Sequence, residues 1–185
     1  MWFSRLEPSL ARGALVVAAL LALLPAAPAR ADCSDLPAPG VEWRRCAMDG
    51  LNLADIDVTG AAIRDSRFGR ADLSRAVMAD ANLTNSRFVG ASLREAILDR
   101  ADLTTVDFTN ADLTGASLKG AHLRRTRFFR AILRDADLTE ARIEGADFLH
   151  TDLSGARWID GKTICAEGST GRCIPTPQPK EAGAR

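Results

Sequence analysis

The sequence predicts an all-β solenoid, and two repeating patterns are the basis of this prediction. A large apolar residue occupies every fifth position from Met48 to Trp158 without a break in register. A second, mostly small residue stands two positions before each large one, as at Ala71, Ala101 and Ala111. An α-helix has a period of about 3.6 residues and a strand a period of about two, so neither produces this pattern.

Each five-residue unit is explained by a short extended piece followed by a corner. Residues two apart on an extended chain point to the same side, so the small and large residues both face inward. The remaining two residues turn the corner, where Gly and Asn suit a positive φ. Such corner pairs are Thr59-Gly60, Gly69-Arg70, Val89-Gly90, Thr109-Asn110, Thr114-Gly115, Lys119-Gly120 and Glu144-Gly145. One unit cannot bury its inward face alone, so the units must wind into stacked coils.

Three segments, at residues 71–75, 101–105 and 111–115, read Ala-Asp-Leu followed by two variable residues. This form is similar to the A(D/N)LXX unit of pentapeptide-repeat proteins, and the resemblance extends over residues 48–158. It implies a right-handed quadrilateral β-helix with four pentapeptides per coil. The repeat region would then hold about five and a half coils.

A weaker period of twenty residues agrees with four units per coil. Phe occupies the central position at Phe68, Phe88, Phe108, Phe128 and Phe148, and at no other central position of the array. We therefore expect the five rings to stack as an internal ladder, with about 4.8 Å between successive coils. We interpret this ladder as core packing and expect no cofactor inside the coil.

Residues 1–31 have the features of a secretory signal peptide. Arg5 and Arg12 provide a basic start, Ala14–Leu24 is an apolar run, and Ala29–Ala31 forms an A-x-A cleavage site. The run is shorter than the ~20 residues that span a bilayer. We expect cleavage before Asp32, a periplasmic or extracellular location, and no transmembrane segment in the mature chain; an uncleaved anchor is the alternative.

The charge balance argues against nucleic acid as a partner. Residues 1–31 contain three arginines and one glutamate, and their removal leaves 21 basic and 23 acidic residues. Binding to nucleic acid requires clustered positive charge, which a nearly balanced chain does not supply in bulk. The same balance weakens the idea that the rod imitates the charge of DNA.

Segments 32–47 and 159–174 flank the array, and both are rich in turn residues. The ends of a solenoid expose unpaired edges, so we expect these segments to act as caps, with Trp43 covering the first coil. Residues 175–185 are rich in Pro and polar residues and are predicted to be a disordered tail.

Four cysteines lie in the two caps, at Cys33, Cys46, Cys165 and Cys173. In an exported chain they favour two disulfides, for which three connectivities are open. Bridged Cα atoms lie within about 7 Å of each other, whereas the two ends of a rod are far apart. We therefore expect Cys33 to pair with Cys46 and Cys165 with Cys173. The spacings do not match a zinc site.

Signatures of catalysis are missing from the sequence. It contains no phosphate-binding P-loop, no G-x-S-x-G turn and no H-E-x-x-H motif. The two histidines, His122 and His150, fall at outward and corner positions, and the outward Asp residues belong to the repeat consensus. We predict that the protein is not an enzyme and has neither a cofactor nor a metal site.

One wall of the predicted rod combines arginine with outward apolar side chains, a composition that resembles interface cores. The candidate interaction face comprises Arg67, Arg87, Arg127, Phe129, Arg130 and Leu149. We interpret it as a docking surface for a protein or an anionic envelope component. The alternative is that these arginines pair with Asp residues along the rungs and contribute little.

The function that follows from these patterns is that of an exported, rigid interaction or structural module of the cell envelope. A secreted effector or host-surface binder is an alternative. A DNA-mimicking, gyrase-binding protein is a further alternative that the family resemblance brings, and the signal peptide and charge disfavour it. The sequence names no partner and leaves the oligomeric state open.

Overall fold

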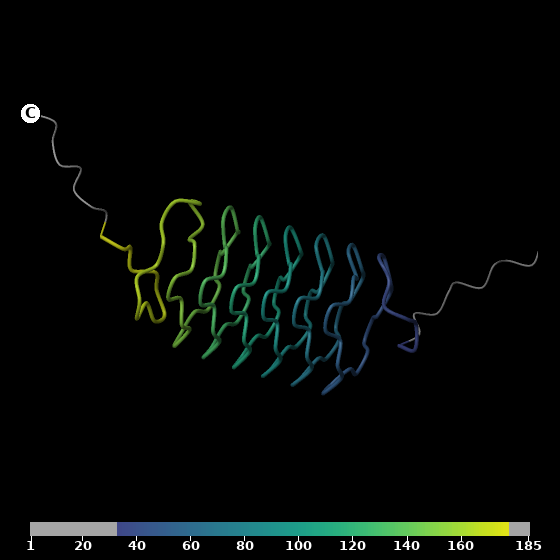
Figure 1. Ribbon diagram of the computed structural model, residues 1–185. Coiled ribbons are helices and arrows are strands. Elements are labelled where there is room, and N and C mark those ends of the chain that lie inside the picture. Colours follow the sequence, from purple (N-terminus) through teal and green to yellow (C-terminus); the bar gives the residue numbers. More distant parts are fainter. Residues whose placement is uncertain (1–32, 178–185) are drawn as a thin grey trace, which may run out of the picture. The chain divides into compact units, whose positions relative to one another are not determined.

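The computed structural model describes residues 33–177 of the 185-residue chain, and these form a column of stacked coils (Figure 1). Residues 33–177 contain no helix and no strand longer than a single bridge, so turns and isolated bridges make up the regular structure. The predicted signal peptide, residues 1–31, and the end of the predicted tail, residues 178–185, lie outside the described residues.

Successive coils are held together by a parallel ladder with a register of twenty residues. Its bridges run from Glu42 with Ala62 to Asp137 with Arg157, and each joins an outward residue to the one twenty positions later. At one rung the Met48 N–H donates to the Arg67 carbonyl at 2.7 Å. The predicted stacking of units through backbone hydrogen bonds is therefore present, as in a β-helix.

The second corner residue of every unit between residues 41 and 155 has a positive φ. Sixteen of these residues are not glycine, and their φ values lie between 55° and 61°. In the pair Gly69-Arg70 the arginine adopts this conformation, with φ 56°, and the glycine does not. The expectation that Gly and Asn would mark these positions was too narrow. Backbone hydrogen bonds to both neighbouring coils hold the corner, so residue type decides little.

Most corners are closed by a hydrogen bond across four residues, as in a type II turn. The Ala71 N–H, for example, donates to the Phe68 carbonyl at 3.1 Å. At two corners, those after Trp43 and Ile63, a buried hydroxyl from the next coil takes the place of this hydrogen bond. The Cys46 N–H donates to Ser66 Oγ at 3.0 Å, and Ser66 Oγ donates to the Trp43 carbonyl at 2.6 Å. Ser86 bridges Ser66 and Ile63 in the same way.

The five predicted phenylalanines form a continuous stack of rings in the core. The centroid distances between successive rings are 4.8, 5.2, 5.3 and 5.1 Å from Phe68 to Phe148. The first four side chains are at most 1% exposed. The Trp158 ring lies 5.8 Å from Phe148, so an aromatic ring covers the C-terminal end of the ladder.

At the N-terminal end, ordered coil structure begins earlier than predicted. The first bridge starts at Glu42, so residues 42–47 belong to the first coil and not only to a cap. Trp43 is 1% exposed, and its indole N–H donates to the Asp35 carbonyl at 3.2 Å. A disulfide joins Cys33 to Cys46, with 5.5 Å between the Cα atoms.

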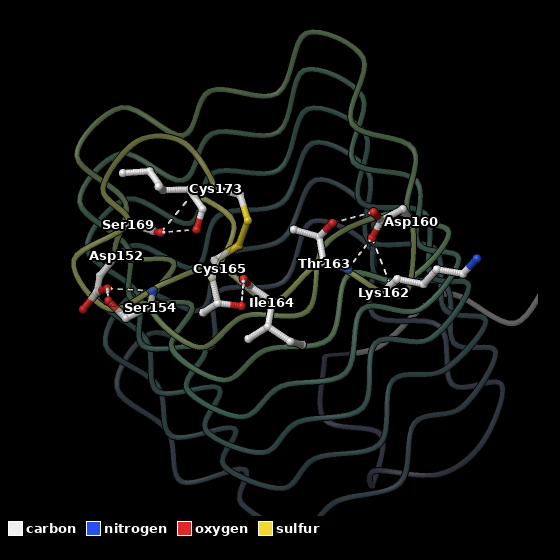
Figure 2. Close-up of a disulfide and its surroundings, with 11 residues drawn as sticks. Asp152, Ser154, Asp160, Lys162, Thr163, Ile164, Cys165, Ser169 and Cys173 are labelled. Atoms are coloured by element: carbon white, nitrogen blue, oxygen red, sulfur yellow. Dashed lines mark hydrogen bonds between the residues drawn. A yellow bond between two sulfur atoms is a disulfide. The ribbon is translucent and has the colours of Figure 1, made fainter. Parts of the chain in front are cut away.

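The C-terminal cap is paired with the last coil and is not the simple loop expected from its glycines. Antiparallel bridges join Asp152 to Thr170 and Arg157 to Ile164. Figure 2 shows the Cys165–Cys173 disulfide, whose Cα atoms are 4.9 Å apart. The two disulfides are the pairs expected from the sequence.

Order also extends past the predicted start of the tail at residue 175. Pro175 bridges Cys165, and the Thr176 N–H donates to the Ile164 carbonyl at 3.0 Å. The last coil has no further coil to pair with, so the cap supplies partners for its edge.

Candidate interaction surface

The register of twenty residues sorts the coils into two stacks of ten-residue segments. We call segments 41–50, 61–70, 81–90, 101–110, 121–130 and 141–150 the arginine half, because they contain eleven arginines and seven carboxylates. The intervening segments, 51–60, 71–80, 91–100, 111–120, 131–140 and 151–160, form the acidic half, with six basic and twelve acidic residues. The two halves therefore carry formal charges of +4 and −6.

Every basic residue of the acidic half has a carboxylate partner. The shortest pair is Arg75 with Asp55, at 2.6 Å, and Arg100 holds Asp80 at 2.7 Å. The others are Arg94 with Asp112, Lys119 with Asp137, Arg134 with Asp152 and Glu167, and Arg157 with Asp137. The cations on this side are thus already neutralised by neighbours within the protein.

These pairs also shift the ionisation of their members. Hydrogen bonds from the Arg75 guanidinium hold the pKa of Asp55 below its ordinary value, and those from Arg100 do the same for Asp80. The pKa of each arginine is raised in return. For Asp112, burial would raise the pKa, but hydrogen bonds from Thr114 and Arg94 outweigh it, and the pKa is lowered.

The arginine half is different, because most of its cations have no carboxylate partner. Within residues 33–177, eight arginines of this half form no ion pair: Arg45, Arg64, Arg70, Arg87, Arg124, Arg125, Arg130 and Arg142. The three pairs that do form here measure 3.3 Å for Arg44 with Glu42, 3.6 Å for Arg67 with Asp49 and 3.8 Å for Arg127 with Asp107, and none is as short as the four shortest pairs of the acidic half. This half therefore presents guanidinium groups to the solvent.

The arrangement around Arg125 explains why a corner arginine is left unpaired. Its stem lies over the corner of the next coil, where a Cβ on Gly145 would be 3.6 Å from the Arg125 Cγ. In the preceding coil, the equivalent position is Thr105, whose hydroxyl donates to the Asn85 side chain. Neither neighbour offers a carboxylate, whereas Arg75 finds one at Asp55.

The residues of the predicted interaction face all lie in the arginine half. Arg67 and Arg127 form the two long pairs described above, and Arg87 has no carboxylate partner among the described residues. Phe129 is half-buried: the Arg130 guanidinium lies 5.1 Å from its ring centre, and the His150 ring forms a T-shaped pair with it, with 5.7 Å between the ring centres. Leu149 is 56% exposed. The aromatic contribution of this face is thus smaller than an exposed Phe129 would give.

Two grooves open on the arginine half. The Arg125 groove has a volume of about 360 Å³ and lies between the corner of Asn85, Thr105 and Arg125 and the rungs of Arg87, Asp107 and Arg127. The His122 groove, of about 290 Å³, is lined by Asp102, Thr104, His122, Arg124, Arg142 and Glu144. The first combines three arginines with one carboxylate, and the second combines two arginines with two carboxylates.

Asn85 and Thr105 line the Arg125 groove and were not among the predicted site residues. The count of charges in alternate ten-residue segments, which follows from the twenty-residue period, points only to the half in which they lie. The pairing itself depends on which side chains stand one coil apart, and the five-residue pattern does not report it.

A search of residues 33–177 found no group of three or more His, Cys, Asp or Glu side chains arranged to hold a metal ion. In the same range there is no helix of sufficient length and hydropathy to cross a membrane.

The fold and the repeat unit define the protein as a β-helical repeat protein. Comparison with known protein families identifies the repeat family to which it belongs. The profile named Pentapeptide repeats matches eight copies, at residues 52–88, 86–125 and 121–157. The chain belongs to the pentapeptide-repeat family.

Solved structures of the same family are similar to this chain. HetL, a pentapeptide-repeat protein involved in heterocyst differentiation regulation in Nostoc sp. strain PCC 7120, is 29% identical over 66% of this chain, with a TM-score of 0.49. The match spans 62% of the HetL chain. Rfr23 from Cyanothece 51142 is 25% identical over 63% of this chain and 90% of its own, with a TM-score of 0.40. A search of curated proteins found no match.

Proposed function

We propose that this protein is a rigid, non-enzymatic interaction module whose binding surface is the arginine half. The observation that carries this proposal is the segregation of ion pairs. All six cations of the acidic half are paired, while eight arginines of the arginine half have no carboxylate partner among the described residues. A guanidinium without an internal partner is available for a carboxylate or phosphate of another molecule.

The fold suits such a role, because it holds its outward groups at a regular spacing. We infer a right-handed, four-sided helix of about five and a half coils, since a register of twenty residues divided by a unit of five gives four units per coil. Backbone ladders and the Phe stack make the column stiff. A stiff column has little backbone freedom to lose on binding, which favours affinity.

The part of this proposal that the protein is not an enzyme rests on its sequence and on its surface. No motif for a nucleophile, a general base or a phosphate loop occurs in the chain. The arginine half offers cations that attract and position an anion. We therefore assign it to binding and not to chemistry.

The place of action in this proposal is the cell envelope, in the periplasm or outside the cell. Two disulfides are consistent with an oxidising compartment, and the first 31 residues resemble a signal peptide. A partner in the envelope would be a protein or another component with an anionic surface.

Affinity capture from an envelope extract tests the proposal with two matched triple variants. Arg87→Gln, Arg127→Gln and Phe129→Ser change the arginine half, and Arg75→Gln, Arg100→Gln and Ile97→Ser make equivalent changes on the acidic half. We expect the first variant to lose a partner that the wild type and the second variant retain, with melting temperatures measured for all three. Equal capture by both variants would contradict the proposal.

A further inference from the structure

We propose that the Arg125 groove is a binding site for a phosphomonoester group. This inference rests on the proposed function, because it assigns a ligand class to one part of the arginine half. The groove of about 360 Å³ is lined by Arg87, Arg125 and Arg127, together with the buried Val106. Arg87 and Arg125 have no carboxylate partner in the described part of the chain.

The one carboxylate of the groove pairs only with Arg127, so Arg87 and Arg125 keep no counter-charge among the described residues. Asp107 accepts hydrogen bonds from the Thr109 N–H at 3.0 Å and the Thr109 hydroxyl at 2.6 Å, both on its Oδ1. Its other oxygen lies 3.8 Å from Arg127, beyond the length of a hydrogen bond. Three guanidinium groups against one carboxylate leave the groove with a formal charge of +2.

The side of the groove formed by Asn85 and Thr105 is already hydrogen-bonded internally. The Asn85 amide donates to Asp65 at 3.2 Å and its carbonyl accepts from the Thr105 hydroxyl. The Thr105 hydroxyl also lies 2.6 Å from the Thr104 carbonyl, and Arg125 stands one coil further on. The side chains of Asn85 and Thr105 are therefore held in place by internal hydrogen bonds, and the arginines remain available to a ligand.

A phosphomonoester matches this set of groups better than a carboxylate does. It carries close to two negative charges at neutral pH and three terminal oxygens, which equals the charge of the groove and the number of its arginines. A guanidinium binds phosphate oxygens through two parallel N–H donors. A carboxylate has a single charge and would leave one positive charge of the groove uncompensated. The His122 groove, with two arginines and two carboxylates, has no such excess.

Titration calorimetry of the full-length chain with inorganic phosphate tests the site. We expect binding that Arg87→Gln with Arg125→Gln weakens at least about tenfold, because each change removes charge-assisted hydrogen bonds. Arg75→Gln with Arg100→Gln removes the same charge from the acidic half and should change the affinity less than about twofold.

A further variant acts without removing an arginine. Thr105→Asp places a carboxylate one coil before Arg125, where Asp55 stands relative to Arg75, and Asp already occupies positive-φ corners at Asp55, Asp65, Asp80 and Asp135. It should weaken phosphate binding about as much as loss of Arg125. Absence of phosphate binding, or equal loss in the arginine-half and acidic-half variants, would overturn the assignment.

Vesicles distinguish the source of the phosphate group. Phosphatidylcholine vesicles containing phosphatidic acid present a phosphomonoester, and those containing phosphatidylglycerol present a phosphodiester of single charge. Preference for phosphatidic acid, lost in Arg87→Gln with Arg125→Gln, identifies a lipid headgroup. Phosphate binding without this preference identifies a soluble phosphomonoester. If phosphate does not bind but the capture experiment still depends on the arginine half, the groove assignment fails and the proposed function stands.

Discussion

The Arg75 guanidinium donates two hydrogen bonds to the carboxylate of Asp55, which lies twenty residues earlier, at 2.6 and 2.7 Å. Arg100 binds Asp80 in the same two-pronged manner. Arg125 occupies the equivalent corner position in the arginine half, but Thr105 stands where the preceding coil would have to supply a carboxylate. The residue one coil earlier therefore decides whether these corner arginines are neutralised or free to bind another molecule.

Removal of a ring from the Phe ladder should be costly. Phe108 is fully buried, and its neighbours Phe88 and Phe128 lie 5.2 and 5.3 Å away on either side. We expect Phe108→Ala to lower the free energy of unfolding by about 3–5 kcal/mol, because it leaves a cavity between two stacked rings. Urea denaturation followed by circular dichroism measures this. A loss below about 1 kcal/mol would contradict the stacked arrangement.

The buried hydroxyl of Ser86 should contribute to stability through the corner that it bridges. It accepts from the Ser66 N–H at 3.1 Å and donates to the Ile63 carbonyl at 2.6 Å. Ser86→Ala leaves both backbone groups without this partner, and we expect a loss of about 1–3 kcal/mol. Thr104→Ala, at an outward corner, is the control. If both variants unfold at the same urea concentration, the corner closes equally well without the hydroxyl.

The C-terminal disulfide should stabilise the cap that pairs with the last coil. Cys165 and Cys173 are eight residues apart, and closing such a loop is worth about 2–3 kcal/mol on the chain-entropy model. We expect the double variant Cys165→Ser with Cys173→Ser to melt at a lower temperature than the wild type. An unchanged melting temperature in differential scanning calorimetry would show that backbone pairing alone holds the cap.

Asp160 should make the stability of the cap depend on pH in the acid range. Its carboxylate accepts from the Thr163 hydroxyl and from the N–H groups of Thr163 and Lys162, as Figure 2 shows. These bonds lower its pKa from 3.8 to about 2. A pKa depressed by folding means that the stabilisation is present above pH 3.8 and is lost as the pH falls through about 2.

The variant Asp160→Asn isolates this effect, because it keeps an oxygen acceptor and removes the titrating group. Thermal melts of both proteins between pH 6 and pH 2 provide the comparison. We expect the wild type to exceed the variant at pH 6 and the difference to shrink with acidification. A difference that stays constant over this range would contradict the role of the ionised carboxylate.

The regular features of the fold were predictable because they repeat. The five-residue register from Met48 to Trp158 gave the inward and outward positions, and the phenylalanines at every twentieth residue gave the ladder. The positive φ at Arg70 was not predictable from residue type, since stacking on neighbouring coils imposes it. The antiparallel pairing of Ile164 with Arg157 was missed because the cap has no period.

The candidate surface was predictable only in part. The column of Arg67, Arg87 and Arg127 followed from the twenty-residue period. Whether an arginine is paired depends on the side chains one coil away, and on small differences in reach. Arg127 stands 3.8 Å from Asp107, whereas Arg75 stands 2.6 Å from Asp55. The availability of Arg125 depends on Thr105, which stands one coil earlier and has no carboxylate, and a search for functional groups overlooks such a position.

The most direct test of the account is a nuclear magnetic resonance titration of the arginine Nε–H signals with inorganic phosphate. It reports on paired and unpaired guanidinium groups in the same sample. We predict that the signals of Arg87, Arg125 and Arg127 shift with a common affinity, while those of Arg75 and Arg100 stay in place because Asp55 and Asp80 occupy their donors. Equal shifts for all five arginines, or none for the first three, would contradict the claim that the arginines of the Arg125 groove form a binding site.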